Sequence, residues 1–125
     1  MENNTASILE KLIIIGDRVL IKPLSDSEKT LAGLYLPPGV QEKEQVRRGY
    51  VMKAGPGYPV PIPVEDETWK KTDDNVRYIP LQVKEGDLAL YLQRNGVEVI
   101  YSNEKYFIVP QHSILLVERD EELLH

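Results

Sequence analysis

The sequence contains no cysteine, one tryptophan, one phenylalanine and two histidines among its 125 residues. Without cysteine, the chain cannot form disulfides, thiolate metal sites or a cysteine nucleophile. Basic residues are in the minority, since 15 lysines and arginines face 20 aspartates and glutamates and leave a formal net charge of -5. This balance disfavours nucleic acids and anionic membrane surfaces as partners.

Long hydrophobic runs are also missing. No run approaches the roughly 18 apolar residues that a membrane-spanning helix needs, and the run at 12–15 is far too short. Met1 is followed by an acidic residue and two asparagines, so the basic start of a signal peptide is absent. We therefore expect a cytoplasmic protein with a single domain over residues 1–125.

Groups that could carry out catalysis are scarce. His125 is terminal and His112 lies among turn residues, so neither is expected to act as a base. Asp17 and Asp87 are expected to be turn residues or ion-pair partners. The glycines at 55–57 lack the Lys-Ser/Thr pair and the helix that follow a phosphate-binding loop. We predict no catalytic residue, no metal site and no cofactor, and hence no enzyme.

What is present is a series of short strand-like segments separated by turn residues. Alternating or β-branched apolar residues predict strands at 17–22, 49–55, 88–92, 97–101, 105–109 and 114–118. Asn95-Gly96 is a strong hairpin signal, and a capping-box pattern indicates one helical turn near 7–12. Many short strands with regularly spaced turns predict an all-β barrel or sandwich.

Two segments between strands are long for a compact domain. The segment at about 24–46 has polar flanks typical of a mobile loop, yet it holds Leu34, Tyr35 and Leu36 at its centre. Such a triplet fits docking into another protein's groove or one more core strand, and the residues alone leave both open. The segment at about 56–82 includes alternating prolines at 59–63, which cannot form a central strand.

Several motifs, taken in order, resemble the GroES co-chaperonin family. They are residues 16–23, residues 32–37 followed by 48–51, the glycines at 55–57, the turn at 83–87 and the closing residues 114–118. The resemblance covers roughly residues 12–118 apart from an insert. It implies an all-β, GroES-like irregular β-barrel with a mobile loop at about 24–46, an extended roof hairpin at about 56–82, and tails at 1–10 and 119–125.

The resemblance also implies a function. In this family the protein caps a GroEL-type chaperonin ring in the presence of nucleotide and helps to enclose folding substrates. The subunits form a heptameric ring, and the nucleotide is bound by the chaperonin, so the co-chaperonin needs no cofactor. The chaperonin-binding residues that it implies are Gly33, Leu34, Tyr35 and Leu36. Tyr35 departs from the small β-branched residue common at that position.

Ring assembly in the family pairs the first strand of one subunit with the last strand of its neighbour. Exposed apolar edges are an aggregation hazard that pairing around a closed ring removes. The implied subunit-interface residues are Ile13, Ile14, Ile15, Ile114, Leu115, Leu116 and Val117. The alternative is that both runs lie in the subunit's own barrel.

The roof insert is longer than in typical members of the family. The residues singled out in it are Glu65, Asp66, Glu67 and Trp69. Two interpretations are open: a longer, partly ordered hairpin, or an insert that enlarges the dome ceiling or packs against neighbouring roofs around Trp69.

Other functions agree less well with the sequence. A divergent GroES-like scaffold that no longer binds a chaperonin would keep the same barrel. Zinc alcohol dehydrogenases also use a GroES-like barrel, but they need Cys and His ligands and an attached dinucleotide domain. An oligonucleotide-binding barrel needs interleaved basic and aromatic positions that this chain lacks.

Overall fold

The computed structural model describes residues 9–24, 45–61 and 76–119. Two short 3-10 helices, η1 (Gln93–Asn95) and η2 (Gln111–Ser113), precede β6 and β8. The strands of the described residues are β1 (Arg18–Pro23), β2 (Val46–Ala54), β3 (Tyr58–Pro61), β4 (Val76–Ile79), β5 (Leu88–Leu92), β6 (Val97–Tyr101), β7 (Glu104–Pro110) and β8 (Ile114–Glu118).

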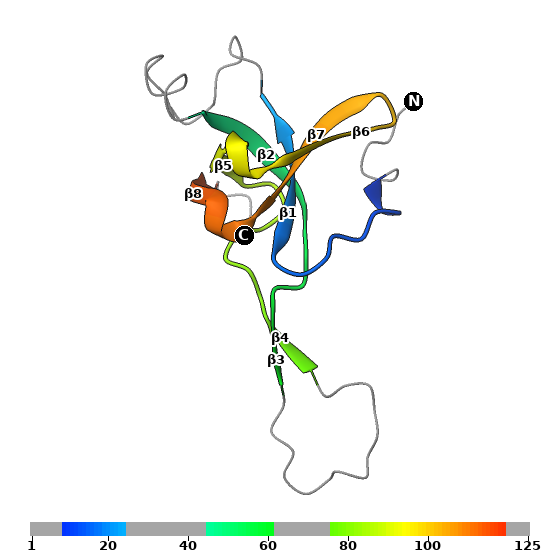
Figure 1. Ribbon diagram of the computed structural model, residues 1–125, viewed down its shortest axis with the longest axis vertical. Coiled ribbons are helices and arrows are strands. Elements are labelled where there is room, and N and C mark those ends of the chain that lie inside the picture. The colour runs from blue at the N-terminus through cyan, green and yellow to red at the C-terminus, as the bar shows by residue number, and fades with distance from the viewer. Residues whose placement is uncertain (1–8, 25–44, 62–75, 120–125) are drawn as a thin grey trace, which may run out of the picture.

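Six of these strands form one antiparallel sheet that curls into an irregular barrel (Figure 1). The order is β6-β7-β1-β2-β5-β8, so the central β1 pairs with both β7 and β2. Within the described residues, β6 and β8 pair on one side only and form the two edges of the sheet. β3 and β4 form a separate hairpin that extends below the barrel in Figure 1. The all-β irregular barrel predicted from the sequence is confirmed.

The barrel interior is filled by one cluster of buried apolar side chains. Alternation along β1 sends Val19 and Ile21 inward, and both are fully buried. Tyr91 and Phe107 pack with their ring centroids 6.1 Å apart. The other buried members of the cluster are Val51, Leu81, Val83, Ala89 and Val109. Burying a large apolar side chain contributes about 1.5–3 kcal/mol, so this cluster is the main source of the barrel's stability.

The outer face of β1 is covered as well. Leu20 alternates with the inward residues of β1, but it is only 1% exposed because the N-terminal segment lies across it. Lys53 fastens that segment by donating hydrogen bonds from Nζ to the carbonyl oxygens of Leu9 (3.1 Å) and Leu12 (2.7 Å). The buried members of this outer cluster are Leu9, Leu20 and Tyr106, and the residues packed against them include Leu12, Ile14 and Met52.

Two bulges interrupt the strand pairing. One makes Met52 the extra residue of β2. The other makes Leu115 the extra residue of β8, between the partners of Leu90 and Tyr91. A bulge bends its strand and increases the local twist, so both bulges help the sheet to curl. The second one lies on an edge strand, where it shapes the surface that the sheet offers to other molecules.

The predicted strands are present with small shifts of their ends. β2 begins at Val46 rather than at 49, and the predicted strand at 105–109 is β7, which runs from 104 to 110. Residues 9–11 form a turn that follows the capping-box pattern, and residues 7 and 8 lie outside the described residues. The prolines of β3 lie in a two-stranded sheet, which confirms that this stretch is not a central strand.

The prediction of a hairpin at Asn95-Gly96 is wrong. Gly96 is extended (φ -107°, ψ 163°), and β5 pairs with β2 and β8 instead of β6. Asn95 donates from Nδ2 to the buried Ser113 Oγ at 3.0 Å, and a Cβ on residue 96 would lie 2.7 Å from a side-chain atom of β7. Packing therefore explains both residues. The hairpin lies between β6 and β7, where Ser102 and Asn103 have the positive φ values (53° and 66°) that a type I′ turn requires.

Candidate functional site

Three regions of the structure correspond to the functional regions predicted from the sequence. They are the ends of the 24–46 segment, the two apolar runs at 13–15 and 114–117, and the base of the roof insert. The predicted binding residues Gly33, Leu34, Tyr35 and Leu36 and the roof residues Glu65, Asp66, Glu67 and Trp69 lie outside the described residues.

The two ends of the 24–46 segment are fixed close together, at the end of the barrel opposite the β3–β4 hairpin (Figure 1). The backbone N–H of Leu24 donates to the carbonyl of Arg48 at 3.0 Å, and the carbonyl of Gln45 accepts from the N–H of Gln93 at 2.9 Å. Val46 is 4% exposed and packs with two leucines of β5. Any group carried by the segment is therefore presented from a narrow, firmly packed base.

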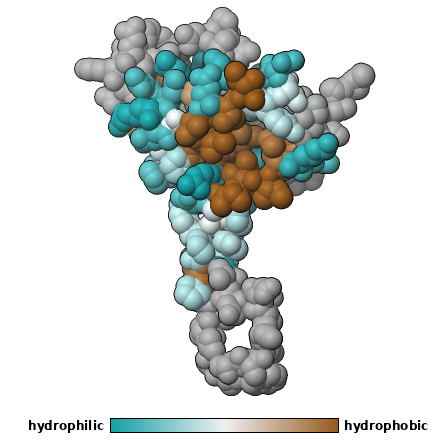
Figure 2. All heavy atoms as spheres, turned by 45° about the vertical axis from the view of Figure 1, so that its right-hand side comes forward, coloured by the Kyte–Doolittle hydropathy of each residue, from teal (hydrophilic) through white to brown (hydrophobic). Residues whose placement is uncertain are grey.

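The first apolar run forms no strand pairing within the described residues. Ile14 packs into the outer cluster, whereas Ile13 and Ile15 are 81% and 64% exposed. The middle isoleucine therefore anchors the run, and its two neighbours face outward. Figure 2 brings this side of the barrel forward and shows hydrophobic residues gathered in one area above the hairpin.

The second apolar run is β8, an edge of the sheet. Leu115 and Leu116 are 51% and 46% exposed, while Ile114 and Val117 pack against the barrel interior. A hollow of about 300 Å³ lies beside the strand and is lined by β8 together with residues of the 82–83 and 111–112 stretches. β8 is hydrogen-bonded to β5 of its own sheet and still presents an apolar outer edge.

The base of the roof insert is a tight junction. Gly57 has a φ of +116°, and its N–H donates to the carbonyl of Gly16 at 3.0 Å. Beyond this junction Tyr58, Tyr78 and Ile79 are exposed on the hairpin. The described part of the insert is therefore an apolar-faced stalk that leaves the barrel through one glycine.

Replacing Gly57 with alanine is expected to lower the free energy of unfolding by about 1–3 kcal/mol, because alanine rarely adopts this φ and its Cβ would collide with the carbonyl oxygen of Ile79. Urea denaturation at a fixed protomer concentration measures the loss. Gly86→Ala is the matched control, since Gly86 also has a positive φ (+95°) but nothing lies within 4 Å of the added Cβ. Equal losses in the two variants would show that the hairpin simply moves aside.

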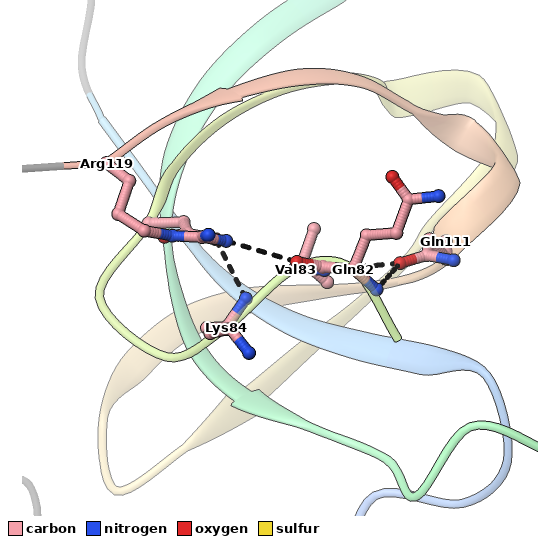
Figure 3. Close-up of polar contacts among 6 residues, drawn as sticks. Gln82, Val83, Lys84, Gln111 and Arg119 are labelled. Atoms are coloured by element: carbon pink, nitrogen blue, oxygen red, sulfur yellow. Dashed lines mark hydrogen bonds and ion pairs between the residues drawn. The ribbon is translucent and has the colours of Figure 1, made fainter. Parts of the chain in front are cut away.

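The turn at 83–87 is closed by an ion pair between Asp87 and Arg119, the residue after β8, and Figure 3 shows the Arg119 side chain reaching this stretch. Asp87 is 1% exposed, and its carboxylate accepts from Arg119 Nε and Nη2, both at 2.7 Å, and from the Lys84 N–H at 2.8 Å. The prediction that Asp87 is a turn residue and ion-pair partner is confirmed. Arg119 therefore belongs to the folded domain, although the sequence assigns it to the 119–125 tail.

The remaining buried polar groups offer little for acid–base chemistry. Burial raises the pKa of the Tyr91 phenol well above its usual range, and Arg47 lowers it by less. Burial also raises the pKa of Tyr106, an effect that Lys22 opposes. Both phenols stay neutral at physiological pH. His112 is exposed, as predicted.

Among residues 9–24, 45–61 and 76–119, no group of three or more histidines and carboxylates is placed to hold a metal ion. Nor does this part of the chain contain a helix of the length and apolar character needed to cross a membrane.

Some residues that shape these surfaces were missed by sequence reasoning. Lys53 fastens the N-terminal segment, Gln111 bonds to both the hairpin and the 82–83 stretch, and Arg119 closes the 83–87 turn. Their partners lie far away along the chain, so no local pattern reveals them. Asp87 gave a partial signal in the sequence, because an acidic turn residue suggests a basic partner but does not identify it.

Comparison with known proteins gives a consistent result. The family model described as "Chaperonin 10 Kd subunit" matches residues 11–118. The chain is 38% identical over 112 residues to a co-chaperonin GroES of Rhodothermus marinus, covering 90% of this chain and 96% of that protein. It is 36% identical over 103 residues to a co-chaperonin GroES of Coprothermobacter proteolyticus, covering 82% of this chain and 90% of that one.

Proposed function

Because this chain belongs to the chaperonin 10 Kd subunit family, and is thereby a co-chaperonin, we propose that it caps a GroEL-type chaperonin ring when nucleotide is bound. The 24–46 segment docks on the chaperonin, with Gly33 as its hinge and Leu34, Tyr35 and Leu36 as its anchor. The chaperonin binds the nucleotide, so this chain needs no cofactor and carries out no catalysis. The proposed working compartment is the cytoplasm.

The observation that carries the proposal is the base of the 24–46 segment. Its two ends leave the barrel beside each other, fixed by the hydrogen bonds of Leu24 and Gln45, on the side away from the hairpin. A segment held at both ends in this way can offer its central residues to a partner without disturbing the core. That arrangement suits a docking element better than a strand of the barrel.

Energetics favour several copies acting together. Burying each of the three anchor side chains gains about 1.5–3 kcal/mol. The conformational entropy that residues around the anchor lose on binding offsets much of this gain. One segment therefore binds weakly, whereas copies on one ring bind with an avidity that can exceed the single affinity by about 10²–10⁴. Such a cap holds firmly and is still released when the chaperonin changes the docking groove.

The ring that the proposal requires is heptameric, with a heterologous contact between neighbours. In it, Ile13 and Ile15 of one copy meet the edge formed by Leu115 and Leu116 of the next. Their exposure supports this assignment. Ile14, Ile114 and Val117 support the contact from within each subunit, because they pack inside their own protomer. The insert, with Glu65, Asp66, Glu67 and Trp69, would form the roof of the ring, on the side opposite the 24–46 segments.

Replacing Leu34 and Leu36 together with serine is expected to abolish the nucleotide-dependent complex with a GroEL-type chaperonin, because the anchor loses most of its apolar area in every copy. Native mass spectrometry, recorded alone and with chaperonin plus nucleotide, reports ring size and complex formation together. Ile100→Ser is the matched control, since it removes an equally aliphatic side chain that is 69% exposed on β6, a strand to which the proposal assigns no role. Binding retained by the double variant would refute the docking assignment. A wild-type ring that never binds chaperonin would favour the scaffold alternative.

A further inference from the structure

The β3–β4 hairpin is joined to the barrel through a small base. It forms its own two-stranded sheet, and such a sheet is only marginally stable by itself. Among the described residues, this base is joined to the barrel by the hydrogen bond from Gly57 N–H to Gly16 and by one from Gln111 Nε2 to the hydroxyl of Tyr58 at 3.2 Å. The direction in which the hairpin points therefore depends on a few contacts.

Gln111 uses both ends of its side-chain amide. Its Nε2 binds Tyr58 on the hairpin, while its Oε1 accepts from the backbone N–H groups of Gln82 (2.7 Å) and Val83 (3.3 Å). Its own N–H donates to the carbonyl of Asp17 at 2.9 Å, which fixes η2 against the start of β1. One side chain thus connects the first strand of the hairpin to the stretch that follows its second strand.

The connection continues to the end of β8. Arg119 Nη2 donates to the carbonyl oxygen of Gln82 at 3.1 Å while the same guanidinium holds the carboxylate of Asp87. Figure 3 shows Gln111 and Arg119 reaching the 82–84 stretch from opposite sides. The polar bridge, as we call it, consists of Tyr58, Gln111, Gln82, Arg119 and Asp87.

We propose that the polar bridge couples the orientation of the β3–β4 hairpin to the position of the end of β8, with Gln111 and Arg119 as positioning residues. The planar guanidinium binds in one fixed geometry, and Asp87, the residue that it grips, is buried. Displacement of the end of β8 must therefore move the carbonyl of Gln82. The side-chain amide of Gln111, which binds both Gln82 and Tyr58, must then move as well. The coupling lies within one protomer and does not depend on the proposed capping function.

Coupling of this kind is reciprocal. Within the proposed ring, a neighbour that pairs along β8 would also restrict the hairpin, and a restrained hairpin would favour a well-placed edge. The orientation of the hairpin would then be fixed as the ring closes, without any direct contact between the hairpin and the pairing strands.

The absence of cysteine makes the test direct, since two introduced cysteines are the only labelling sites. Nitroxide labels at Arg77→Cys on the hairpin and Lys105→Cys on β7, both exposed positions, report the hairpin's orientation as a distance distribution. Dilution with unlabelled chain leaves at most one labelled copy in each assembly. We expect Tyr58→Phe, which removes only the hydroxyl, to widen the distribution, and Arg119→Lys, which keeps the charge but loses the fork, to widen it as well.

Hydrogen exchange gives a second reading of the same variants. Coupling between two sites commonly changes an equilibrium constant by about 5–150-fold. We therefore expect Arg119→Lys to speed hydrogen exchange of the β4 amides by at least about 5-fold. Exchange of the β6–β7 amides should be unchanged. The double variant Tyr58→Phe with Arg119→Lys should exchange no faster at β4 than Tyr58→Phe alone, because both changes break one bridge.

Two control variants sharpen the test. Gln111→Glu keeps the oxygens that accept from Gln82 and Val83 and offers a carboxylate to the Tyr58 hydroxyl, so it should preserve the wild-type distance distribution, whereas Gln111→Leu should widen it. Glu104→Gln breaks the exposed 3.3 Å pair with Lys22, which lies off the bridge, and should change nothing at the hairpin. The proposal is overturned if Arg119→Lys leaves the hairpin as in the wild type, or if the effects of Tyr58→Phe and Arg119→Lys add.

Discussion

Replacing Arg119 with methionine is expected to lower the free energy of unfolding by about 3–5 kcal/mol, which is the usual effect of removing one partner of a buried ion pair. The carboxylate of Asp87 is only 2% exposed and would remain in the barrel wall without its cation. Methionine preserves most of the apolar stem of arginine, so the loss reports the charge more than the packing. Urea denaturation at a fixed protomer concentration measures it, because oligomerisation makes apparent stability depend on concentration.

Two further variants separate this effect from a general loss of charge. Lys22→Met removes one partner of an ion pair whose side chains are 42% and 48% exposed, and such surface pairs contribute only about 0–1 kcal/mol. Adding Asp87→Asn to Arg119→Met should recover part of the stability, because no buried charge then remains unpaired. A double variant less stable than Arg119→Met alone would contradict this account and assign the loss to missing hydrogen bonds.

Introducing aspartate at either apolar surface is expected to convert the proposed ring into monomers. Leu115→Asp and Ile15→Asp each place a charge where the proposed contact excludes water, and burying an unpaired charge is strongly unfavourable. The affinity for chaperonin should fall by about 10²–10⁴-fold when the ring is lost, because each 24–46 segment then binds without avidity. Native mass spectrometry of each variant checks both expectations.

A mixture of the two variants gives the sharper result. In a heterologous contact each subunit uses two different faces, so the intact isoleucine face of Leu115→Asp can pair with the intact β8 face of Ile15→Asp. The mixture should therefore form dimers and stop there. Ile100→Asp, at an exposed position off both faces, should retain the full ring. Rings formed by either variant alone would show that the subunits assemble through another surface.

The fold could be predicted from the sequence to the extent that its strands are local features. Alternating apolar residues and turn residues located the strands of the six-stranded sheet, but not their order in it. Strict alternation predicts that Leu20 faces solvent, whereas the N-terminal segment covers it. At Asn95-Gly96 tertiary packing determined the structure, because both residues serve contacts with β7 and η2. Local patterns cannot report contacts of that kind.

The candidate site could also be predicted from the sequence only in part. Ile13, Ile15, Leu115 and Leu116 are exposed, as a surface that binds a neighbour requires, and their pairing stays a prediction. The anchor of the 24–46 segment stays a prediction too, since it lies outside the described residues. Arg119 was assigned to a tail because the run of charges at 118–122 resembles a solvated end. Its partner, Asp87, lies 32 positions earlier, and only the fold brings the two together.

The bulge at Leu115 has a consequence for the newly made chain. Before it meets its neighbours, a subunit presents β8 as an open edge, and regular open edges recruit other extended chains into fibrous aggregates. An extra residue at the second position of a five-residue strand interrupts the repeat that such stacking needs. A partner matched to the kink can still bind. In the proposed ring, this irregularity would disfavour wrong association of a subunit before it meets its neighbour.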